Sequence, residues 1–424
     1  MNAQLQSLSS QAAEARERAN VEAARRMCAS DPVLVDIRRA GDVVPGMTPT
    51  TILTSGPPLQ NDEYTGGQRR AILFGAVYEG LATDLDDAER KLAAGEITVS
   101  NCHAHGCVGS VAGIYTASMP VFVVENPPFA NTAFCNFYEG KERRRLNYGC
   151  YDGGVHERLE HINTVLGPVV GAAVRAVGGI ELVPIMRRAL QMGDECHSRS
   201  AAATMLFEEA LALPLLDLAV ENPAGVRALY EAFQGNDYHF LRLSMAACKA
   251  ACDAAHGIEG STVVTAMTFS CQGFAIRVSG LGDTWFRGPH AVATAKLFPG
   301  HTEDEITWMG GESIITETAG LGGFAQAAAL PLQRYQGGTA KALIDRNLEL
   351  YDICVGEHTE YRIPLFDYRG TPTGIDIDRV VATGILPAMD VGIPGRDGGQ
   401  IGAGFIRAPI ECFRDALAAA DAAR

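Results

Sequence analysis

The sequence predicts a mixed α/β protein of several domains, in which a small helical domain is inserted between two α/β parts. With 424 residues, the chain is too long for one hydrophobic core. β-Branched and aromatic runs that end at glycine or polar residues indicate strands in the first and last thirds, and helical periodicity dominates the middle third. We expect a helical arm over 1–30, a first α/β domain over 31–183, a helical domain over 184–260 and a second α/β domain over 261–424.

The composition excludes several partners. The net charge is −15 and no basic stripe is present, which argues against nucleic acid and anionic membranes. The eleven cysteines are odd in number and scattered, so free thiols in a reducing cytoplasm are expected. The first 26 residues lack the apolar core of a signal peptide. The uncharged run over 106–124 contains Gly, Ser and Pro, and indicates a loop and a buried strand, not a membrane span.

The first third begins with an arm and continues with two strands that end in polar residues. Residues 10–28 carry charge pairs four apart, typical of a helix packed on the body or on another subunit. A helix over 84–95, closed by Gly95, precedes a strand that leads into "NCHAHGCVG". A second strand, "MPVFVVEN", ends at Glu125 and Asn126. Because ligands of α/β sheets bind beyond strand ends, both ends are expected to contribute to a site.

Helices fill the middle third, and a hairpin opens the last. The clearest helix, over 237–257, is predicted to begin at Asp237 and to carry Arg242 and Lys249 on its polar side. These two side chains either are solvated or face the same cleft as Arg277. From residue 261, "TVVTAMTFS" and "FAIRVSG" predict a hairpin. "ESIITETAGLGGFAQAAALPL" then predicts a strand, a glycine-rich turn and a helix. The last sixty residues hold a glycine-rich loop and an alanine-rich final helix.

"CHAHGC" allows four interpretations. His103 and His105 would share a face on a strand, and with the neighbouring cysteines they could bind a metal, but no zinc-finger, HExxH or CxxC spacing is present. Cys102 with a histidine base could act as a nucleophile. We favour a polar loop that faces a substrate, where the imidazoles donate hydrogen bonds and Gly106 lets backbone N–H groups approach. A structural turn remains the fourth possibility.

Two charged segments are further candidates. "GDECHSR" places Asp194 where it can cap the following helix, with His197 and Arg199 near a helix N-terminus that attracts anions. Plain capping explains the same pattern. Arg277 lies in the middle of a predicted strand, so a buried guanidinium there needs a partner. That partner is either a ligand phosphate or carboxylate, or Asp283.

Glycine-rich segments complete the set of candidates. "TETAGLGGF" resembles a phosphate-binding loop by its expected strand–glycine–helix context, although it is not a Walker A motif. Glu317, before these glycines, is a candidate acid or base. "GIPGRDGGQIGAGFIR" offers Arg396 and Arg407 beside many backbone N–H groups.

Together these stretches resemble one bacterial family, known as domain of unknown function 1116. The resemblance extends over about residues 30–412 and includes "NCHAHGCVG", "SMPVFVVEN", "QMGDECHSR", "FAIRVSGLGD" and "SIITETAGLGGFA". It implies a mixed α/β fold with a small helical domain. One branch of the family belongs to the multi-subunit oxamate carbamoyltransferase, which exchanges a carbamoyl group between oxalurate with phosphate and oxamate with carbamoyl phosphate. Members are typically encoded beside acyl-CoA-synthetase-like proteins.

The chain departs from the family pattern at several positions. Ser110 and Val111 replace a more common Pro-Met pair, and Ser198 stands where Asn is common. "FSCQGF" replaces a more polar turn. The chain also lacks the Ser-Thr-Arg-Thr-Arg and His-Cys-Leu-Pro motifs of ordinary carbamoyltransferases. Carbamoyl transfer is therefore implied by the resemblance and by no motif in the residues.

From the resemblance we predict a carbamoyltransferase, or a subunit of one, that acts on a small amide or ureide acid. Its phosphate is expected at Arg277 and the glycine loop, its carbonyl at the two imidazoles, and its carboxylate at Arg199 or Arg407. The predicted catalytic residues are His103, His105, Glu317, Asp194 and Glu195. The predicted substrate-binding residues are Asn101, Gly106, Glu125, Asn126, His197, Arg199, Asn236, Asp237, Lys249, Arg277, Ser279, Asp283, Gly320, Gly322, Gly323, Arg396 and Arg407.

No metal or cofactor is expected. The predicted partners are a small anionic substrate, further copies of the chain and, in a hetero-complex, an acyl-CoA-synthetase-like subunit. Two other functions remain open. One is a metal-dependent amide hydrolase that uses the loop of His103 and His105. The other is a non-catalytic subunit that binds a ligand or a partner chain.

Overall fold

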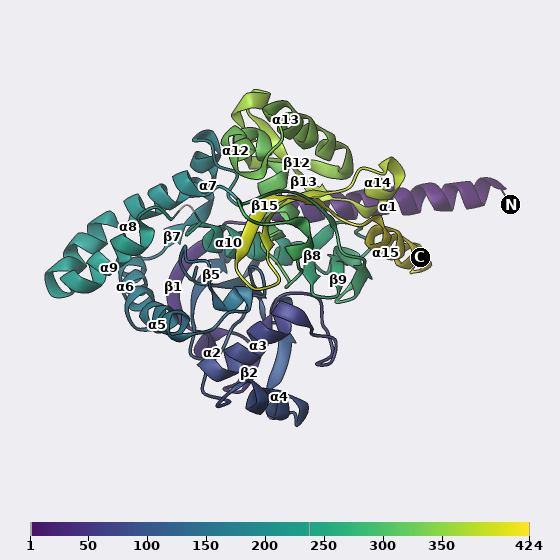
Figure 1. Cartoon of the computed structure of the whole chain (residues 1–424). Coiled ribbons are helices and arrows are strands. Elements are labelled where there is room, and N and C mark those ends of the chain that lie inside the picture. Colours follow the sequence, from purple (N-terminus) through teal and green to yellow (C-terminus); the bar gives the residue numbers. More distant parts are fainter. Residues whose placement is uncertain (1, 237, 424) are drawn as a thin grey trace.

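The computed structural model describes residues 2–236 and 238–423, and it opens with a long helical arm. Helix α1 (Asn2–Cys28) projects from the body at its N-terminal end and packs beside β12, β13 and α10 at the other (Figure 1). Buried Asn20 fixes this packing, because its Oδ1 accepts a hydrogen bond from the Thr262 N–H at 2.7 Å. The predicted pairs Glu14–Arg18 and Glu22–Arg26 are present. The predicted arm helix is confirmed.

The first α/β part contains two sheets. The larger sheet has the order β4-β6-β5-β1-β7, and its three long strands are antiparallel neighbours. Its strands are β1 (Val33–Arg39), β4 (Cys107–Val108), β5 (Pro120–Asn126), β6 (Asn131–Asn136) and β7 (Ile180–Glu181). The smaller sheet is a parallel pair, β2 (Thr51–Thr54) and β3 (Thr98–Asn101). Helices α2 (Ala40–Val43), α3 (Gly66–Tyr78) and α4 (Leu85–Ala93) lie around it (Figure 1).

The helix predicted over 84–95 is confirmed as α4. Asp84 caps it by accepting a hydrogen bond from the Asp87 N–H, and Gly95 follows with a φ of 74°. The two strand ends expected to share a site lie in different sheets, because β3 pairs with β2 and β5 pairs with β1 and β6. The expectation of one shared edge is therefore wrong.

Six helices form the middle of the chain. They are α5 (Gly153–His161), α6 (Gly167–Ala176), α7 (Leu182–Gln191), α8 (Ala201–Glu221), α9 (Pro223–Phe233) and α10 (Leu241–Ala254). Helix α10 is buried along its whole length, so Arg242 and Lys249 lie inside the protein and not on a solvated side. The predicted N-cap Asp237 lies outside the described residues, and the helix begins four residues later than predicted.

Three small sheets form the second α/β part. The predicted hairpin is confirmed as β8 (Val264–Ser270) and β9 (Gly273–Val278), and β10 (Trp285–Gly288) extends it. A second sheet contains β11 (Val292–Leu297), β14 (Ala388–Pro394) and β15 (Gln400–Arg407). The third is the pair β12 (Cys354–Ile363) and β13 (Arg369–Ile375). Helices α12 (Gln333–Gln336), α13 (Ala340–Glu349), α14 (Ile377–Thr383) and α15 (Ile410–Ala422) complete this part.

The strand–glycine–helix unit predicted around "TETAGLGGF" is wrong. Ile315–Thr318 forms one helical turn, α11, and Gly322–Phe324 forms a 3-10 turn. Both follow a buried bridge between Phe269 and Gly311 that ties the segment to β8. The β-branched run therefore packs as a buried turn beside α10, because its tertiary surroundings override its strand propensity.

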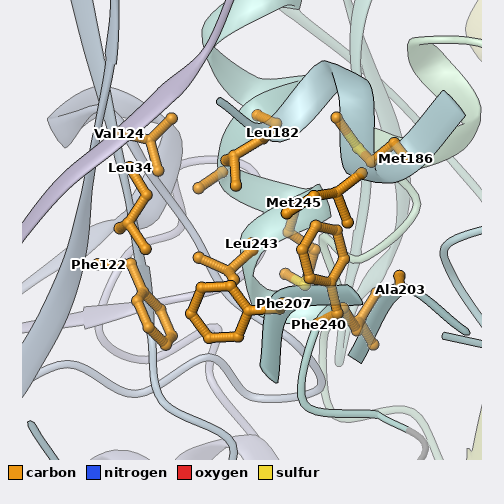
Figure 2. Close-up of a cluster of buried hydrophobic side chains, with 14 of the residues drawn as sticks. Leu34, Phe122, Val124, Leu182, Met186, Ala203, Phe207, Phe240, Leu243 and Met245 are labelled. Carbon is orange, nitrogen blue, oxygen red and sulfur yellow. The ribbon is translucent and has the colours of Figure 1, made fainter. Parts of the chain in front are cut away.

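The largest buried cluster joins the first α/β part to the middle helices. Figure 2 shows Leu34 and Phe122 of the large sheet facing Phe207 of α8 and Leu243 of α10. The cluster also includes Met27 of the arm. Since residues on both sides of position 184 share this cluster, the domain boundaries stay a prediction. Among residues 2–236 and 238–423, no helix is both long enough and apolar enough to cross a membrane. All eleven cysteines are free thiols.

Candidate functional site

A cavity of about 70 Å³ lies where the first part, the middle helices and the second part meet. One water-sized group needs about 10–15 Å³ of such space, so the cavity has room for a small acid. Its wall takes residues from the 110–111 and 138–148 loops, from 197–198, from the start of α10, and from 310–313 and 391–400.

Two buried guanidiniums reach this cavity. Arg145 is 7% exposed and Arg242 is 4% exposed, and both line the wall. Arg145 donates to the Tyr138 hydroxyl at 2.9 Å and Arg242 donates to Asn136 Oδ1 at 3.2 Å, so these hydrogen bonds go to neutral oxygens. In the described part of the chain, the Nε atoms of both have no hydrogen-bond partner. Buried cations without a carboxylate partner are costly, and a bound anion would stabilise them.

The loop that carries Arg145 is held from behind. The carboxylate of Glu139 accepts hydrogen bonds from the N–H groups of Leu146 and Asn147 at 2.6 and 2.9 Å. The guanidinium of Arg145 lies 4.4 Å from the ring centroid of Tyr148, a cation–π distance. The Glu139 carboxylate also accepts a hydrogen bond from the Asn147 side chain at 2.5 Å, so its oxygens hold the loop. The position of Arg145 is fixed by this loop and by the aromatic ring.

His197 forms a dyad with Glu317 at the cavity wall. Its Nδ1 lies 2.8 and 2.9 Å from the two carboxylate oxygens of Glu317 and 3.0 Å from the Thr316 hydroxyl. Its Nε2 has no hydrogen-bond partner among the described residues. Burial lowers the pKa of His197, but the charge and hydrogen bond of Glu317 outweigh this, so the pKa is raised above 6.5. A carboxylate on one ring nitrogen and an open second nitrogen suit proton transfer.

Two further carboxyls lie behind the dyad. The backbone N–H of Asp390 donates to Glu317 at 2.8 Å, and the Gly322 N–H donates to the carbonyl of Glu195. Burial, together with the neighbouring charge of Glu317, raises the pKa of Asp390. Burial and the charges of Asp390 and Glu317 raise the pKa of Glu195 well above its usual range. Protons are therefore held in this cluster at a pH where exposed carboxyls have lost them.

Strained backbone lies beside the cavity on both sides. Val111 has a φ of 56° and Cys196, next to His197, has a φ of 64°. For a β-branched residue such a positive φ is an outlier, and strain of this kind is concentrated at functional sites. The N–H groups of Ser110 and Val111 have no partner within the described ranges. A left-handed residue after another N–H donor is typical of anion-binding concavities.

Comparison with known proteins identifies the family. The profile of "Oxamate carbamoyltransferase subunit AllG" matches residues 97–313, which include both guanidiniums and His197. A protein with that same description from Escherichia coli (strain K12) is 36% identical over 406 residues, which cover 95% of this chain and 96% of the relative. The chain belongs to the AllG family.

Two further proteins are similar to this chain over most of their length. "Uncharacterized protein YahG" from Escherichia coli (strain K12) is 41% identical over 401 residues, which cover 94% of this chain and 84% of YahG. A crystal structure of a conserved protein of unknown function from Enterococcus faecalis V583 superposes with a TM-score of 0.93 at 38% identity, covering 97% of this chain and 99% of that one. The mixed α/β multi-domain fold predicted from the sequence is therefore confirmed.

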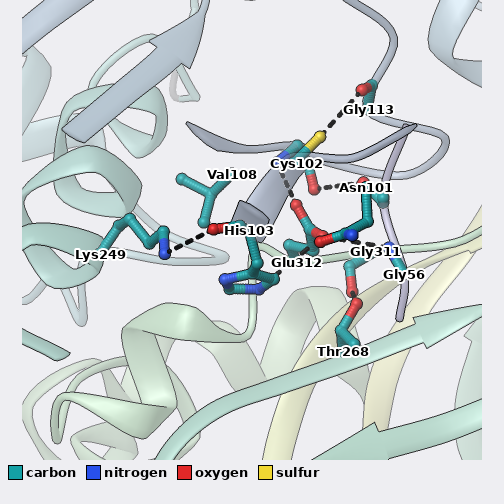
Figure 3. A network of polar contacts seen from close by, with 12 residues as sticks. Gly56, Asn101, Cys102, His103, Val108, Gly113, Lys249, Thr268, Gly311 and Glu312 are labelled. Atoms are coloured by element: carbon teal, nitrogen blue, oxygen red, sulfur yellow. Dashed lines mark hydrogen bonds and ion pairs between the residues drawn. The ribbon is translucent and has the colours of Figure 1, made fainter. Parts of the chain in front are cut away.

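The two imidazoles of "CHAHGC" do not share a face in this AllG family member, contrary to the prediction. Cys102–His105 is a 3-10 turn, capped by Asn101 and ended by Gly106 at a φ of 69°. His103 points inward, 3.7 Å from Glu312 (Figure 3), whereas His105 lies against the carbonyl of Pro45 and the hydroxyl of Ser100. A 3-10 helix has three residues per turn, so side chains two positions apart point in different directions. On a strand, side chains two positions apart would point to the same face.

This separation weakens the metal interpretation. No set of three His, Cys, Asp or Glu side chains in residues 2–236 and 238–423 is placed to hold a metal ion. The nucleophile interpretation is also weakened, since burial raises the pKa of Cys102 well above 9.0 and its thiol donates to the Gly113 carbonyl.

His103 belongs to a buried polar cluster beside the cavity, not to its wall. Glu312 accepts a hydrogen bond from the Gly56 N–H at 3.0 Å (Figure 3). It accepts a second from the Gly109 N–H at 2.7 Å. Burial raises the pKa of Glu312 to about 8, although these hydrogen bonds act in the opposite direction. Lys249 contacts the carbonyl of His103 at 3.4 Å. Glu312 thus joins the 109–111 loop to the 310–313 segment, and both line the cavity.

Asp283, one of the two partners predicted for Arg277, is not its partner in the structure. Arg277 donates to Asp253 at 2.8 Å, and Lys249 pairs with the same carboxylate at 2.6 Å. Asp283 is exposed and lies near His256 instead. The hydroxyl of Ser279 donates to the Ala255 carbonyl, a structural contact at the end of α10. None of these residues lines the cavity.

The glycine loop does not offer its N–H groups to a phosphate. The Gly323 N–H donates to Glu317 at 3.0 Å, and the Gly322 N–H is taken by Glu195. Gly320 has a φ of 92°, and a Cβ there would lie 2.6 Å from the Thr373 hydroxyl. The glycines permit close packing around the Glu317 carboxylate, which a Cβ at position 322 would meet at 2.3 Å.

The remaining predicted residues lie away from the cavity wall. Asp194 accepts from the Ala203 N–H at the start of α8, and Arg199 contacts Asp194 and the Gly193 carbonyl. The other residues with protein contacts or positions of their own are Glu125 (exposed on β5), Asn126 (bonded to Asp31, Ser30, Asn131 and Ala250), Asn236 (bonded to Ala232 and Tyr238), Arg396 (bonded to the Asp304 carbonyl) and Arg407 (paired with Glu349). Asp237 lies outside the described residues.

Of the predicted site residues, His197 lines the cavity, and Glu317 contacts His197 through a hydrogen bond. Sequence reasoning missed Arg145, because "KERRR" resembles a solvated charge run. For Arg242 it left two positions open, one in solvent and one facing the same cleft as Arg277. The one available signal for burial was that Arg242, Lys249 and Asp253 form only a narrow polar stripe on an otherwise apolar helix.

Proposed function

We propose that the cavity binds a small carboxylate or phosphate acid, and that the chain takes part in carbamoyl transfer to an amide acid such as oxamate. The observation that carries the proposal is the pair of buried guanidiniums, Arg145 and Arg242, beside the open Nε2 of His197. The relative named AllG is described as a subunit of oxamate carbamoyltransferase, whose substrates by resemblance are both anions.

In this proposal each group has a defined task. Arg145 and Arg242 hold the phosphate of carbamoyl phosphate or the carboxylate of the acceptor through charge-assisted hydrogen bonds. The N–H groups of Ser110 and Val111 face the carbonyl oxygen on which negative charge develops. Each such donor is worth about 3–4 kcal/mol of transition-state stabilisation.

The proposed reaction balances with one proton transfer. The acceptor's amide nitrogen attacks the carbamoyl carbon, a C–N bond forms, and the bond from that carbon to the phosphate oxygen breaks. Phosphate leaves with the bonding electron pair. Neutral His197 takes the amide proton at Nε2 and then passes it to the departing phosphate, and Glu317 stabilises the imidazolium that forms between these two transfers.

The departures from the family pattern bear on the acceptor. Ser110, Val111 and Ser198 all line the cavity, so the positions that differ from the usual residues contact the space that would hold the substrate. We therefore propose an acceptor of the same class as oxamate, a small amide or ureide acid, without requiring oxamate itself.

One observation favours a second candidate, a non-catalytic binding subunit. The cavity has room for about one small acid, whereas transfer needs a donor and an acceptor together. In that case the chain would hold one substrate and another subunit would provide the second. Both candidates share the anion site and differ in whether this chain alone turns over.

Phosphate release from carbamoyl phosphate in the presence of oxamate tests the proposal, with the chain alone and in its native complex. Calorimetric titration with phosphate and with oxamate is run in parallel. Turnover that falls at least a hundredfold in His197→Asn supports transfer at this site. Binding without turnover, alone and in the complex, rejects transfer and supports the binding subunit. No binding of either anion rejects the site itself.

A further inference from the structure

Helix α8 exposes an apolar stripe, defined here as Met205, Leu213, Leu216 and Val220. Their side chains are 63, 75, 65 and 85% exposed, and they include four of the five most exposed large hydrophobic residues in the described part of the chain. At 3.6 residues per turn these positions fall within about 80° around the helix, over a length of about 22 Å. The four side chains therefore share one face of the helix, with the exposed Glu209 between Met205 and Leu213.

The opposite face of the same helix is buried. Phe207, Leu211 and Leu215 belong to the largest hydrophobic cluster, and Figure 1 places α8 and α9 at the edge of the molecule. A helix with apolar residues on two opposite faces normally has both of these faces covered. Exposed contiguous apolar surface marks a site of protein association. Since one face of α8 is covered by the chain itself, the stripe is suited to a second element from outside.

The charges beside the stripe restrict what covers it. Helix α8 carries Glu208, Glu209, Asp217 and Glu221 and contains no Lys or Arg. If a second copy packed antiparallel about Leu213, Glu209 of one copy would face Asp217 of the other, and these like charges repel. An anionic membrane surface is repelled for the same reason, and membrane-surface helices are rich in basic residues.

We propose that the stripe of α8 is a docking face for an amphipathic helix of a partner protein, whose apolar side is flanked by lysine or arginine. An amphipathic helix binds such a surface through apolar side chains at helical spacing, and the flanking charges give specificity. The inference does not depend on the proposed function, because no stripe residue lines the cavity.

The test uses the full chain and two synthetic helical peptides of about five turns. One has a leucine face flanked by lysine, and the other has the same leucine face flanked by glutamate. Binding is measured by fluorescence anisotropy. We expect the leucine–lysine peptide to bind and Leu213→Asp to weaken it at least tenfold. The matched control is Val292→Asp, since Val292 is 81% exposed on β11 and the substitution adds the same charge.

The control separates docking from general attraction to an acidic protein. General attraction predicts that both aspartates leave binding unchanged or strengthen it, whereas docking predicts a loss in Leu213→Asp alone. Equal affinity in the two variants overturns the proposal. Sedimentation that shows a self-association abolished by Leu213→Asp also overturns it, in favour of a second copy.

A charge-reversed variant provides a second test that leaves the apolar side chains of the stripe unchanged. Glu209→Lys with Asp217→Lys changes two exposed positions only. The proposal expects the preference between the two peptides to exchange, with the leucine–glutamate peptide now the tighter by at least tenfold. An unchanged preference contradicts the charge argument, even if Leu213→Asp fails to fold.

Discussion

Replacing Arg242 by glutamine should weaken anion binding without destabilising the fold. Arg242 is 4% exposed, donates to Asn136 Oδ1 at 3.2 Å, and lies 5.9 Å from the ring centroid of Tyr138. The substitution removes the charge and keeps an amide donor that can reach toward Asn136. Replacing an arginine that stabilises the fold should lower the free energy of unfolding and leave anion binding unchanged. Replacing an arginine that binds a ligand should weaken anion binding and leave the free energy of unfolding unchanged or higher.

The magnitudes follow from the contacts. A hydrogen bond from a charged group is worth about 1.5–3 kcal/mol, so the loss of one to the anion weakens binding by about tenfold to 150-fold. On the stability side, replacing a buried charge that lacks an ionic partner is neutral or stabilising, by up to a few kcal/mol. We expect the free energy of unfolding of Arg242→Gln to be equal to or higher than that of the native chain.

The assay combines denaturant unfolding with calorimetric titration of phosphate and oxamate. Arg277→Gln is the matched control, because Arg277 is also a buried arginine but is paired with Asp253 at 2.8 Å. Breaking that pair is expected to cost several kcal/mol of stability and to leave anion affinity unchanged. Unchanged affinity in Arg242→Gln, or a stability loss as large as that of the control, would refute the reasoning.

Three further predictions concern pH and strain. The raised pKa of His197 adds stability that is complete below pH 6.5 and lost as pH rises through the folded-state pKa, so His197→Asn should flatten that decline in Tm. Burial raises the pKa of Glu312 to about 8, so stability should fall as pH rises from about 4.5 to 8. Glu312→Gln should remove this decline in Tm, and a decline that persists in the variant would contradict the prediction. Val111→Gly should not lower Tm, because relief of a positive φ worth about 1–3 kcal/mol offsets the flexibility of glycine; a loss above about 2 kcal/mol would show that Val111 is unstrained.

Local sequence patterns predicted most of the elements because they depend on local chemistry. The arm helix, α4 and the hairpin of β8 and β9 follow from spacing, caps and alternation. The strand predicted within 312–324 was wrong because the β-branched residues there fit a strand equally well. Only packing against α10 and β8 selects the helical turn. The prediction that His103 and His105 share a face was wrong for a related reason. Residues two apart share a face on a strand but not on a 3-10 turn.

The candidate site was predictable only where a residue's neighbours in sequence hold it. His197 lies in a dense charged segment and was found, while its link to Glu317 joins residues 120 positions apart. Arg145 has no local feature that separates a buried cation from a solvated one, and Arg242 has only the narrow polar stripe of its helix. Their burial depends on how the 138–148 loop packs against α10, which is a property of the whole fold.

The most direct test of the account is the position of oxamate in a crystal of the complex with this chain. The account predicts the oxamate carboxylate within hydrogen-bond distance of both Arg145 and Arg242, with its amide nitrogen facing His197 Nε2. Oxamate bound elsewhere, with both guanidiniums uncontacted, would contradict it.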